Sequence, residues 1–469
     1  MLKINIISNF LGTAYGILLQ FALLPFVLKA LGAEAYGLVG VFTALVGLFS
    51  LLDLGMSPAL GRELSRLSAI PDSGNKMRQT VTTLELICGA VSILIGLILF
   101  FGSNFLSEHW LNKTTIPQST VGVCLAWMGI QTALQFMTSY YNSGLLGLQR
   151  IKLSNLLSAI MQTIRTVAVL GLLFTNLHIS SKPLIEQYFA LNMLISAFTL
   201  VVTAICLYRV LPAKDIEIER KGLINNIQNR FSLERFKACW RYAAGMTATM
   251  LAVMLLTQLD KIILSKILNL EQFGYYSIAA NIANAVTRSA PIIFGAVLPR
   301  FTQLVALNDI KQLETVYIKS LKLVAWIVLP ISGVLILFSE PLFVLYLKNK
   351  ASAAAIAPLA SILTVGNSLH SMMYMPYALS LAFGWTRYGL NISVVASIFL
   401  LPIILFGALN YGATGAAYAW LILNIGYMIF SLKYLHSKFL NHLFIKFYTT
   451  ILVPALIFLV LISAYFMQK

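Results

Sequence analysis

The sequence predicts an all-α, polytopic membrane protein made of two six-helix bundles that are parallel repeats, followed by about one additional C-terminal helix. Three observations predict this fold. Of the 469 residues, 59% are hydrophobic and only 10% are charged, whereas an ordinary soluble domain has about 25% charged residues. The apolar residues form runs long enough to span a bilayer, and a short motif recurs in the second half of the chain.

Thirteen apolar runs, separated by charged or Pro/Asn-rich breaks, have the length of a spanning helix. About 20 mostly apolar residues are needed, because backbone polar groups must be satisfied within the bilayer. The first run follows Lys3 and is longer than the apolar core of a secretory signal, about 7 to 15 residues, so we interpret it as a span. The runs cover approximately residues 5–28, 37–66, 80–102, 118–144, 153–175, 184–208, 242–265, 275–304, 320–347, 355–383, 388–408, 412–435 and 446–466.

One long polar segment divides the chain. Residues 209–241 hold eight basic and four acidic residues and separate six spans from the rest. We therefore predict an N-terminal six-helix bundle over 1–208, a cytoplasmic linker over 209–241, a C-terminal six-helix bundle over 242–435 and an additional helix within 436–469.

A repeated motif predicts that the two bundles are copies. KALGAEAYG at 29–37 matches KILNLEQFG at 266–274 at Lys, Leu, Glu, an aromatic residue and Gly, with a constant offset of 237. Six spans separate the copies, and an even number returns the chain to the same side. The halves are thus parallel repeats about an axis along the membrane normal, a design that places a transporter's substrate site near the midplane.

The distribution of basic residues predicts a cytoplasmic N-terminus, because lysine and arginine are enriched in cytoplasmic loops. With that orientation, 23 of the 33 basic residues lie in cytoplasmic segments and three lie within helices. The seven in outer segments are Lys29, Lys113, Lys182, Lys266, Lys348, Lys350 and Lys469. Topology therefore explains the formal charge of +17, and we predict no nucleic-acid partner.

The cysteines indicate neither a disulfide framework nor a metal site. Cys88, Cys124, Cys206 and Cys239 are scattered, without CxxC or histidine spacing. We predict free thiols, no metal and no cofactor.

Several predicted helices have one polar face, with polar residues at intervals of three or four. Such residues can simply join neighbouring helices by hydrogen bonds, worth about 0.6 kcal/mol each. Because five helices share the pattern, we favour a hydrated cavity. The five stripes are Asn9, Thr13, Gly16, Gln20; Gln131, Gln135, Thr138, Asn142; Asn155, Ser158, Gln162, Arg165; Ser277, Asn281, Asn284, Arg288; and Asn367, His370, Tyr374.

Charged residues inside predicted spans identify candidate site residues. An ionised group at the bilayer centre costs about 2.5 to 3.5 kcal/mol, so it normally faces the protein interior. Arg165 and Arg288 lie mid-helix, Asp53 lies near the middle of the second helix, and Asp260 and Lys261 lie in the outer part of the seventh. A structural ion pair between Asp53 and Arg288 is one alternative. Arg165 has no evident acid in its half, so we predict a cationic cavity suited to phosphate.

The stretch LLDLGMSPALGRELSRL, residues 51–67, ends the second predicted helix. That helix is about 45 Å long at 1.5 Å per residue and exceeds the bilayer core of about 30 Å, so its end must leave the membrane. Pro58 has no backbone N–H to donate to the Leu54 carbonyl, so it can bend the helix. Arg62 and Arg66 form a basic face at the cytoplasmic headgroups, where they can act as topology anchors only.

LGAEAYG at 31–37, together with LLDLGMSPALGRELS at 51–65, resembles the polysaccharide transporter branch of the MOP flippase superfamily, and within it the Wzx-type O-antigen or repeat-unit flippases. The resemblance covers both halves. It implies a V of two six-helix bundles, alternating access, and transfer of an undecaprenyl-pyrophosphate-linked oligosaccharide to the periplasmic leaflet of a bacterial inner membrane. Membrane lipids are implied partners, and polysaccharide polymerase and chain-length proteins are conceivable ones.

The resemblance implies that cationic cavity residues hold the pyrophosphate, a role carried over to Arg165, Arg288 and Lys261. We expect polar stripes to solvate the sugars. The complete predicted substrate-contacting set is Arg165, Arg288, Lys261, Asn281, Asn284, Gln162, Asn142 and Gln20. Asp53 and Asp260 are expected to form ion pairs or to couple transport to H⁺ or Na⁺.

Two other functions remain as alternatives. A multidrug or cation antiporter of the same superfamily typically has an acidic residue in the first helix, and residues 5–28 contain none. A membrane glycan polymerase or ligase needs catalytic groups facing the periplasm. The longest outer loop, 103–117, offers only Glu108, His109 and Lys113, so we predict that the protein is not an enzyme.

Overall fold

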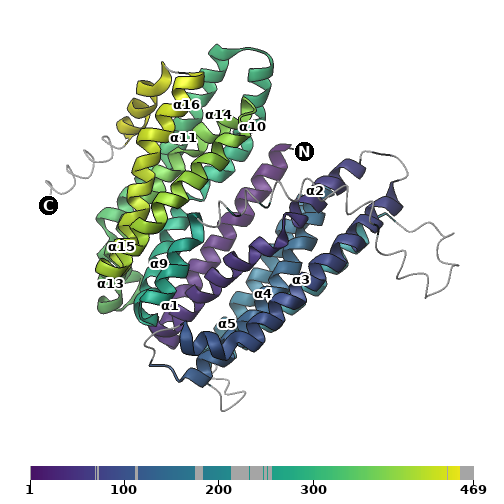
Figure 1. The fold of residues 1–469 in the computed structure, drawn as a ribbon, viewed down its shortest axis with the longest axis vertical. Helices are drawn as coiled ribbons and strands as arrows, with labels where there is room; N and C mark the ends of the chain where they lie inside the picture. The colour runs from purple at the N-terminus through teal and green to yellow at the C-terminus, as the bar shows by residue number, and fades with distance from the viewer. Residues whose placement is uncertain are drawn as a thin grey trace. The chain divides into compact units, whose positions relative to one another are not determined.

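The computed structural model is helical throughout the part of the chain that it describes, residues 2–68, 70, 73–110, 115–174, 183–212, 232, 247, 251, 256–440 and 442–454 (Figure 1). The chain divides into two compact units, Met1–Gln258 and Leu259–Lys469. The predicted linker, 209–241, lies outside the described residues except for 209–212 and Ser232. The domain boundaries at 208 and 242 therefore stay a prediction.

The first unit is organised around one central helix, α4. This helix packs along α3 over much of its length (Figure 1) and also contacts α6 and α2, while α1 packs against α5. Its elements are α1 Leu2–Phe49, η1 Ser50–Asp53, α2 Met56–Leu67, α3 Gly74–His109, α4 Gln118–Gly147, α5 Ile151–Phe174 and α6 Leu184–Val210.

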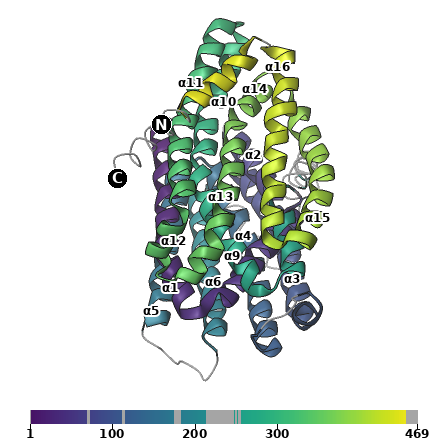
Figure 2. The same cartoon turned by 90° about the vertical axis from the view of Figure 1, so that its left-hand side faces the viewer.

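The second unit is organised in the same way around α13, which lies against both α9 and α15 (Figure 2). Its elements are a helix over 256–267, α9 Leu270–Thr287, α10 Ser289–Ala306, α11 Ile310–Leu337, α12 Ser339–Leu347, α13 Lys350–Met372, α14 Tyr374–Ala382, α15 Thr386–Gly426, η3 Tyr427–Ser431, α16 Leu432–Phe439 and a helix over Leu443–Pro454. The spans that contain α4 and α13 are the most buried in the described chain.

Nine helices of the described chain are long and apolar enough to cross a membrane, compared with thirteen predicted spans. Two pairs of predicted spans are merged into α1 and α15, whose backbones leave the helical region only at Gly32 (φ 83°, ψ 168°) and Gly412 (φ 61°, ψ −138°). Both glycines adopt positive φ, a conformation that is unfavourable for residues with a Cβ atom. The spans predicted at 242–265 and 446–466 lie partly outside the described residues.

The second predicted span, 37–66, is not one continuous helix. It breaks where Leu54 and Gly55 adopt positive φ (47° and 69°), and α2 begins at Met56. Pro58 has no N–H for the Leu54 carbonyl, which removes the bond that would carry the helix through. The helix therefore ends and restarts, where we predicted only a bend.

The same proline placement recurs in the second unit. Pro291 is the third residue of α10 and Pro376 the third residue of α14, as Pro58 is in α2. With the offset of 237, the break at 50–55 corresponds to 287–292, which contains the α9–α10 junction, and Gly32 corresponds to the turn at Asn269. The repeat seen in the sequence is thus reflected in where helices stop and restart.

The end of α2 is held by an internal ion pair. Arg66 donates to Glu63 through Nε (3.0 Å) and Nη2 (2.5 Å), and Glu63 is buried while Arg66 is exposed. A bidentate contact of this kind fixes both side chains. Arg66 is therefore engaged within its own helix, which fits a structural role.

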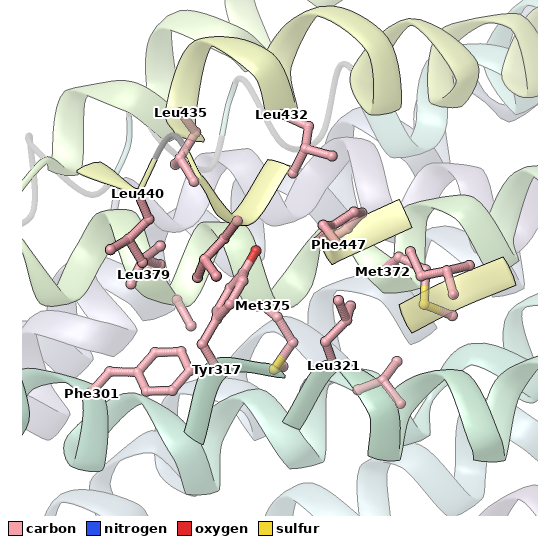
Figure 3. Close-up of a cluster of buried hydrophobic side chains, with 14 of the residues drawn as sticks. Phe301, Tyr317, Leu321, Met372, Met375, Leu379, Leu432, Leu435, Leu440 and Phe447 are labelled. Atoms are coloured by element: carbon pink, nitrogen blue, oxygen red, sulfur yellow. The ribbon is translucent and has the colours of Figure 1, made fainter. Parts of the chain in front are cut away.

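A cluster of buried hydrophobic residues in the second unit joins α10, α11, α14, α16 and the last helix (Figure 3). Phe301, Tyr317, Met375 and Phe447 are fully buried there. The hydroxyl of Tyr317 lies 3.0 Å from Nε2 of His436, so one polar contact is enclosed by apolar packing. Phe447 places the start of the predicted additional C-terminal helix within this unit's core.

Glycines of α4 set its spacing from α2 and from α6. A Cβ on Gly147 would overlap the carbonyl oxygen of Gly61, and one on Gly144 would lie 2.8 Å from Leu207. Small residues allow such close approach of helices inside membranes, where dispersion contacts and weak Cα–H···O bonds drive association. The glycines in LGRELS and SGLLG are therefore packing residues.

Gly147→Ala should destabilise the protein. The added methyl meets backbone that cannot rotate away, and overpacking of this kind costs about 1 to 3 kcal/mol. We expect a lower thermal unfolding midpoint of the purified protein in detergent. Gly89→Ala is the matched control, because no atom lies within 4 Å of its Cβ position and alanine favours a helix by about 1 kcal/mol over glycine. Equal midpoints for the two variants would contradict the assignment.

Candidate functional site

Arg165 lies two-thirds of the way along α5 and points toward α6. Its Nη2 donates to Ser196 Oγ at 3.2 Å, and Tyr188 of α6 lies close enough to interact with it electrostatically. Its buried Nε has no hydrogen-bond partner among the described residues. Within that part of the chain no carboxylate lies at ion-pair distance from its guanidinium.

Arg288 occupies the junction between α9 and α10, at the middle of the span Leu270–Ala306. Its backbone N–H bonds to the Ala285 carbonyl, three residues back, at 3.4 Å. The side chain is exposed, and its guanidinium makes no hydrogen bond or ion pair within the described chain. Each unit therefore has one mid-span arginine without a described carboxylate partner.

Part of the predicted polar lining joins helices in the first unit. Gln162 Nε2 donates to the Gly16 carbonyl at 3.1 Å, which ties α5 to α1. Asn142 Oδ1 accepts from Ser154 Oγ at 2.5 Å, which ties α4 to α5. Gln20 is exposed and has no hydrogen bond to another described residue. Of the predicted stripe on α1, the side chains of Asn9 and Thr13 lie outside the described part.

In the second unit the predicted polar residues meet. Asn367 of α13 donates through Nδ2 to Asn284 Oδ1 of α9 at 2.9 Å, and its Oδ1 accepts from Trp420 Nε1 at 2.7 Å. One turn further along α13, His370 Nδ1 lies 3.0 Å from Asn424 Oδ1. The stripes on α9 and α13 therefore form one network with α15. Asn281 of the same α9 stripe is half-buried.

The two predicted acids have different partners. Asp53 is buried and accepts from Ser57 three times, from its N–H at 3.1 Å to each carboxylate oxygen and from its Oγ at 2.6 Å. Asp260 accepts from the hydroxyl of buried Tyr276 at 2.5 Å, while its Oδ1 is buried without a partner among the described residues. Lys261, beside it, is buried.

The carboxylate of Asp53 thus caps the break before α2, because it satisfies an N–H that has no partner within that helix. The alternative ion pair with Arg288 would join residues of different units and stays a prediction. The roles of all ten predicted site residues are proposals.

Sequence reasoning missed Glu85 of α3. Its carboxylate accepts from the hydroxyl of Tyr141 in α4 at 2.7 Å and from that of Tyr208 in α6. One turn away on α3, Cys88 lies close enough to Asp53 to interact electrostatically. A lone glutamate inside the apolar run 80–102 was the available signal. Its tyrosine partners could not be found, since they lie more than fifty residues away.

The described residues include no group of three or more His, Cys, Asp or Glu side chains that could hold a metal ion. Asp53, Asp260 and Glu85 each accept a hydrogen bond from a described hydroxyl, whereas the guanidinium groups of Arg165 and Arg288 have no carboxylate at ion-pair distance among the described residues. Such groups bind phosphate through paired N–H donors. The arrangement therefore suits recognition of an anionic headgroup.

Comparison with known proteins relates the chain to a family and a fold. The family described as "Polysaccharide biosynthesis protein" matches residues 2–305. The "Putative O-antigen transporter" of Shigella flexneri is 21% identical over 421 residues, which cover 89% of this chain and 94% of that protein.

Solved structures share the fold at low identity. The lipid II flippase MurJ in an inward closed conformation superposes with a TM-score of 0.72 at 15% identity, covering 100% of this chain and 93% of that one. An inward-facing multidrug resistance MATE family transporter of the MOP superfamily gives 0.70 at 14% identity, covering 91% and 95%. The all-helical, multi-pass fold predicted from the sequence is confirmed by these matches. The chain belongs to the polysaccharide biosynthesis protein family.

Proposed function

We propose that the protein is a flippase that moves an undecaprenyl-pyrophosphate-linked oligosaccharide from the cytoplasmic to the periplasmic leaflet of a bacterial inner membrane by alternating access. The observation that carries the proposal is the pair of mid-span arginines, Arg165 and Arg288, for which the described chain offers no carboxylate partner. Family membership and the name of the Shigella flexneri relative support the glycan part of the proposal.

An arginine without a carboxylate partner is unfavourable inside a membrane, because placing it there costs about 2.5 to 3.5 kcal/mol, and a bound anion would offset that cost. A pyrophosphate is a suitable anion, since each guanidinium can donate two parallel hydrogen bonds to phosphate oxygens. In this proposal Arg165 and Arg288 hold the pyrophosphate, with Lys261 as a further cation. Asn281, Asn284, Gln20 and the other polar side chains solvate the sugars.

Membrane potential favours the proposed direction. Each negative charge moved outward across 100 mV, inside negative, gains about 2.3 kcal/mol. A substrate with two phosphate charges therefore gains twice that amount, and no chemical step is required of the protein. The proposal is consequently a transporter and not an enzyme. Coupling to H⁺ or Na⁺ would fall to Asp260, whose Oδ1 has no described partner, before Asp53, which caps a helix.

Native mass spectrometry of the gently purified protein tests the substrate. We expect a polyprenyl-pyrophosphate glycan to co-purify with wild type. The affinity of the protein for this lipid should fall at least tenfold in Arg165→Ala/Arg288→Ala. Each lost charge-assisted hydrogen bond costs about 1.5 to 3 kcal/mol, and about 1.4 kcal/mol is a factor of ten.

Arg62→Ala is the control, because Arg62 is an exposed residue in the middle of α2 and lies outside the proposed site. Equal lipid occupancy in wild type and the double variant would remove both arginines from the site. Drug efflux by the intact protein, without a bound glycan lipid, would favour the multidrug alternative.

Membrane orientation can be tested separately. The excess of basic residues places the N-terminus in the cytoplasm, so Lys311 should face inward and Lys350 outward. Both side chains are exposed. In a cysteine-free background, a membrane-impermeant maleimide added to spheroplasts should label Lys350→Cys at once and Lys311→Cys only after permeabilisation. The opposite pattern would invert the topology and the proposed direction of transport.

A further inference from the structure

We infer that an aromatic cluster in the second unit, formed by His370, Tyr374, Trp420 and Tyr427, contacts a saccharide of the transported molecule. The inference rests on the proposed function and deepens it, because it assigns the sugar-contacting residues. None of these four belongs to the predicted substrate-contacting set, although His370 and Tyr374 belong to one of the predicted polar stripes. Trp420 and Tyr427 belong to neither, and the aromatic character of the contact is new.

The four rings surround one histidine. Ring centroids of Tyr374, Trp420 and Tyr427 lie 5.7, 5.6 and 6.3 Å from that of His370. They come from α13, α14, α15 and η3, so two stretches of the chain, 370–374 and 420–427, converge on this point. Aromatic faces with adjacent polar groups are the usual composition of a small-molecule site, and a sugar presents both C–H faces and hydroxyls.

The cluster is held in place by its own hydrogen bonds. Trp420 Nε1 donates to Asn367 at 2.7 Å, and the indole packs on Gly366, where an added Cβ would lie 2.9 Å from its Cδ1. His370 Nδ1 contacts Asn424 at 3.0 Å. These bonds fix the ring planes before any ligand arrives, which lowers the entropic cost of binding.

Other polar atoms of the same cluster remain available. Within the described chain, His370 Nε2 and the hydroxyls of Tyr374 and Tyr427 make no hydrogen bond, and all four residues are half-buried. Polar groups inside a membrane protein normally have a partner, since leaving them unpaired in lipid is costly. A hydroxyl-rich ligand would supply partners for all three atoms.

The cluster lies at the level of Arg288. On one side of Arg288, Asn284 of α9 contacts Asn367 of α13. On the other side, Phe294 of α10 contacts Tyr374 of α14, with ring centroids 6.0 Å apart. Residue numbers rise together along the two stretches of chain, from the contact of 284 with 367 to the contact of 294 with 374. Arg288 lies between positions 284 and 294 and His370 between positions 367 and 374, so Arg288 lies beside the segment that contains His370. A sugar bonded directly to a pyrophosphate held by Arg288 would therefore meet the cluster.

A packed histidine or a lipid-facing aromatic band would be the simpler alternative. A packed histidine explains the Asn424 contact but leaves Nε2 without a partner. An interfacial aromatic band lies near the ends of spans, whereas His370 lies in the interior of the span Lys350–Ala382. Both alternatives predict no dependence of binding on the sugar.

The test compares lipids that differ only in the sugar. The full-length protein in detergent is titrated, by native mass spectrometry, with undecaprenyl pyrophosphate and with the same lipid bearing N-acetylglucosamine, N-acetylgalactosamine, glucose or galactose. We expect wild type to bind at least one glycosylated lipid about tenfold more tightly than the bare lipid. Tyr374→Phe/Tyr427→Phe removes two hydroxyls and should abolish that gain without changing affinity for the bare lipid.

Tyr418→Phe is the matched control, because Tyr418 is an exposed residue of α15 near Trp420, and it should retain the full gain. The inference is overturned if wild type binds all five lipids equally, or if the double variant keeps the gain. With either of these outcomes, the proposed function would still stand if Arg165→Ala/Arg288→Ala lost binding to the bare lipid while wild type and the tyrosine variants kept it. Failure of wild type to bind any of the five lipids would instead overturn the proposed function.

Discussion

The need to satisfy backbone hydrogen bonds inside a bilayer governs this structure, and it is most evident where helices stop. A break in a spanning helix exposes N–H and C=O groups that lipid cannot satisfy. At the first break, Asp53 supplies acceptors to Ser57. At the α9–α10 and α13–α14 junctions, tightened turns satisfy the backbone instead, as Arg288 and Met373 bond to carbonyls three residues back. Irregular backbone at this depth is tolerated only within protein or beside water.

These breaks also explain where charge and polarity collect. Helices that stop and restart bring polar side chains to the middle of a span. Asp53, Arg288 and His370 all lie within a few residues of such a junction. The polar network of the second unit, from Asn284 through Asn367 to Trp420, lies beside two of them. Local helix chemistry and the candidate site are therefore one feature of the fold.

Some spans and their ends could be predicted from hydropathy alone. The runs predicted at 118–144 and 184–208 correspond to Gln118–Gly147 and Leu184–Val210. The breaks were harder, although the prolines at 58, 291 and 376 signal them, because proline in a spanning helix can bend it or end it. Contacts such as Gln162 with Gly16 depend on which helices become neighbours. Hydrophobic periodicity marks a polar face and does not identify the helix opposite.

In the second unit, two helices are interrupted at neighbouring positions, the α9–α10 junction and the α13–α14 junction. Arg288 and Met373 each have a tightened backbone turn, and each is followed by a helix with proline at its third residue. After these two turns, α10 and α14 share a buried hydrophobic core with α11 and the last helix. Tightened turns inside a helix often mark hinges, so any bending of the second unit is expected at these two junctions, next to Arg288 and His370.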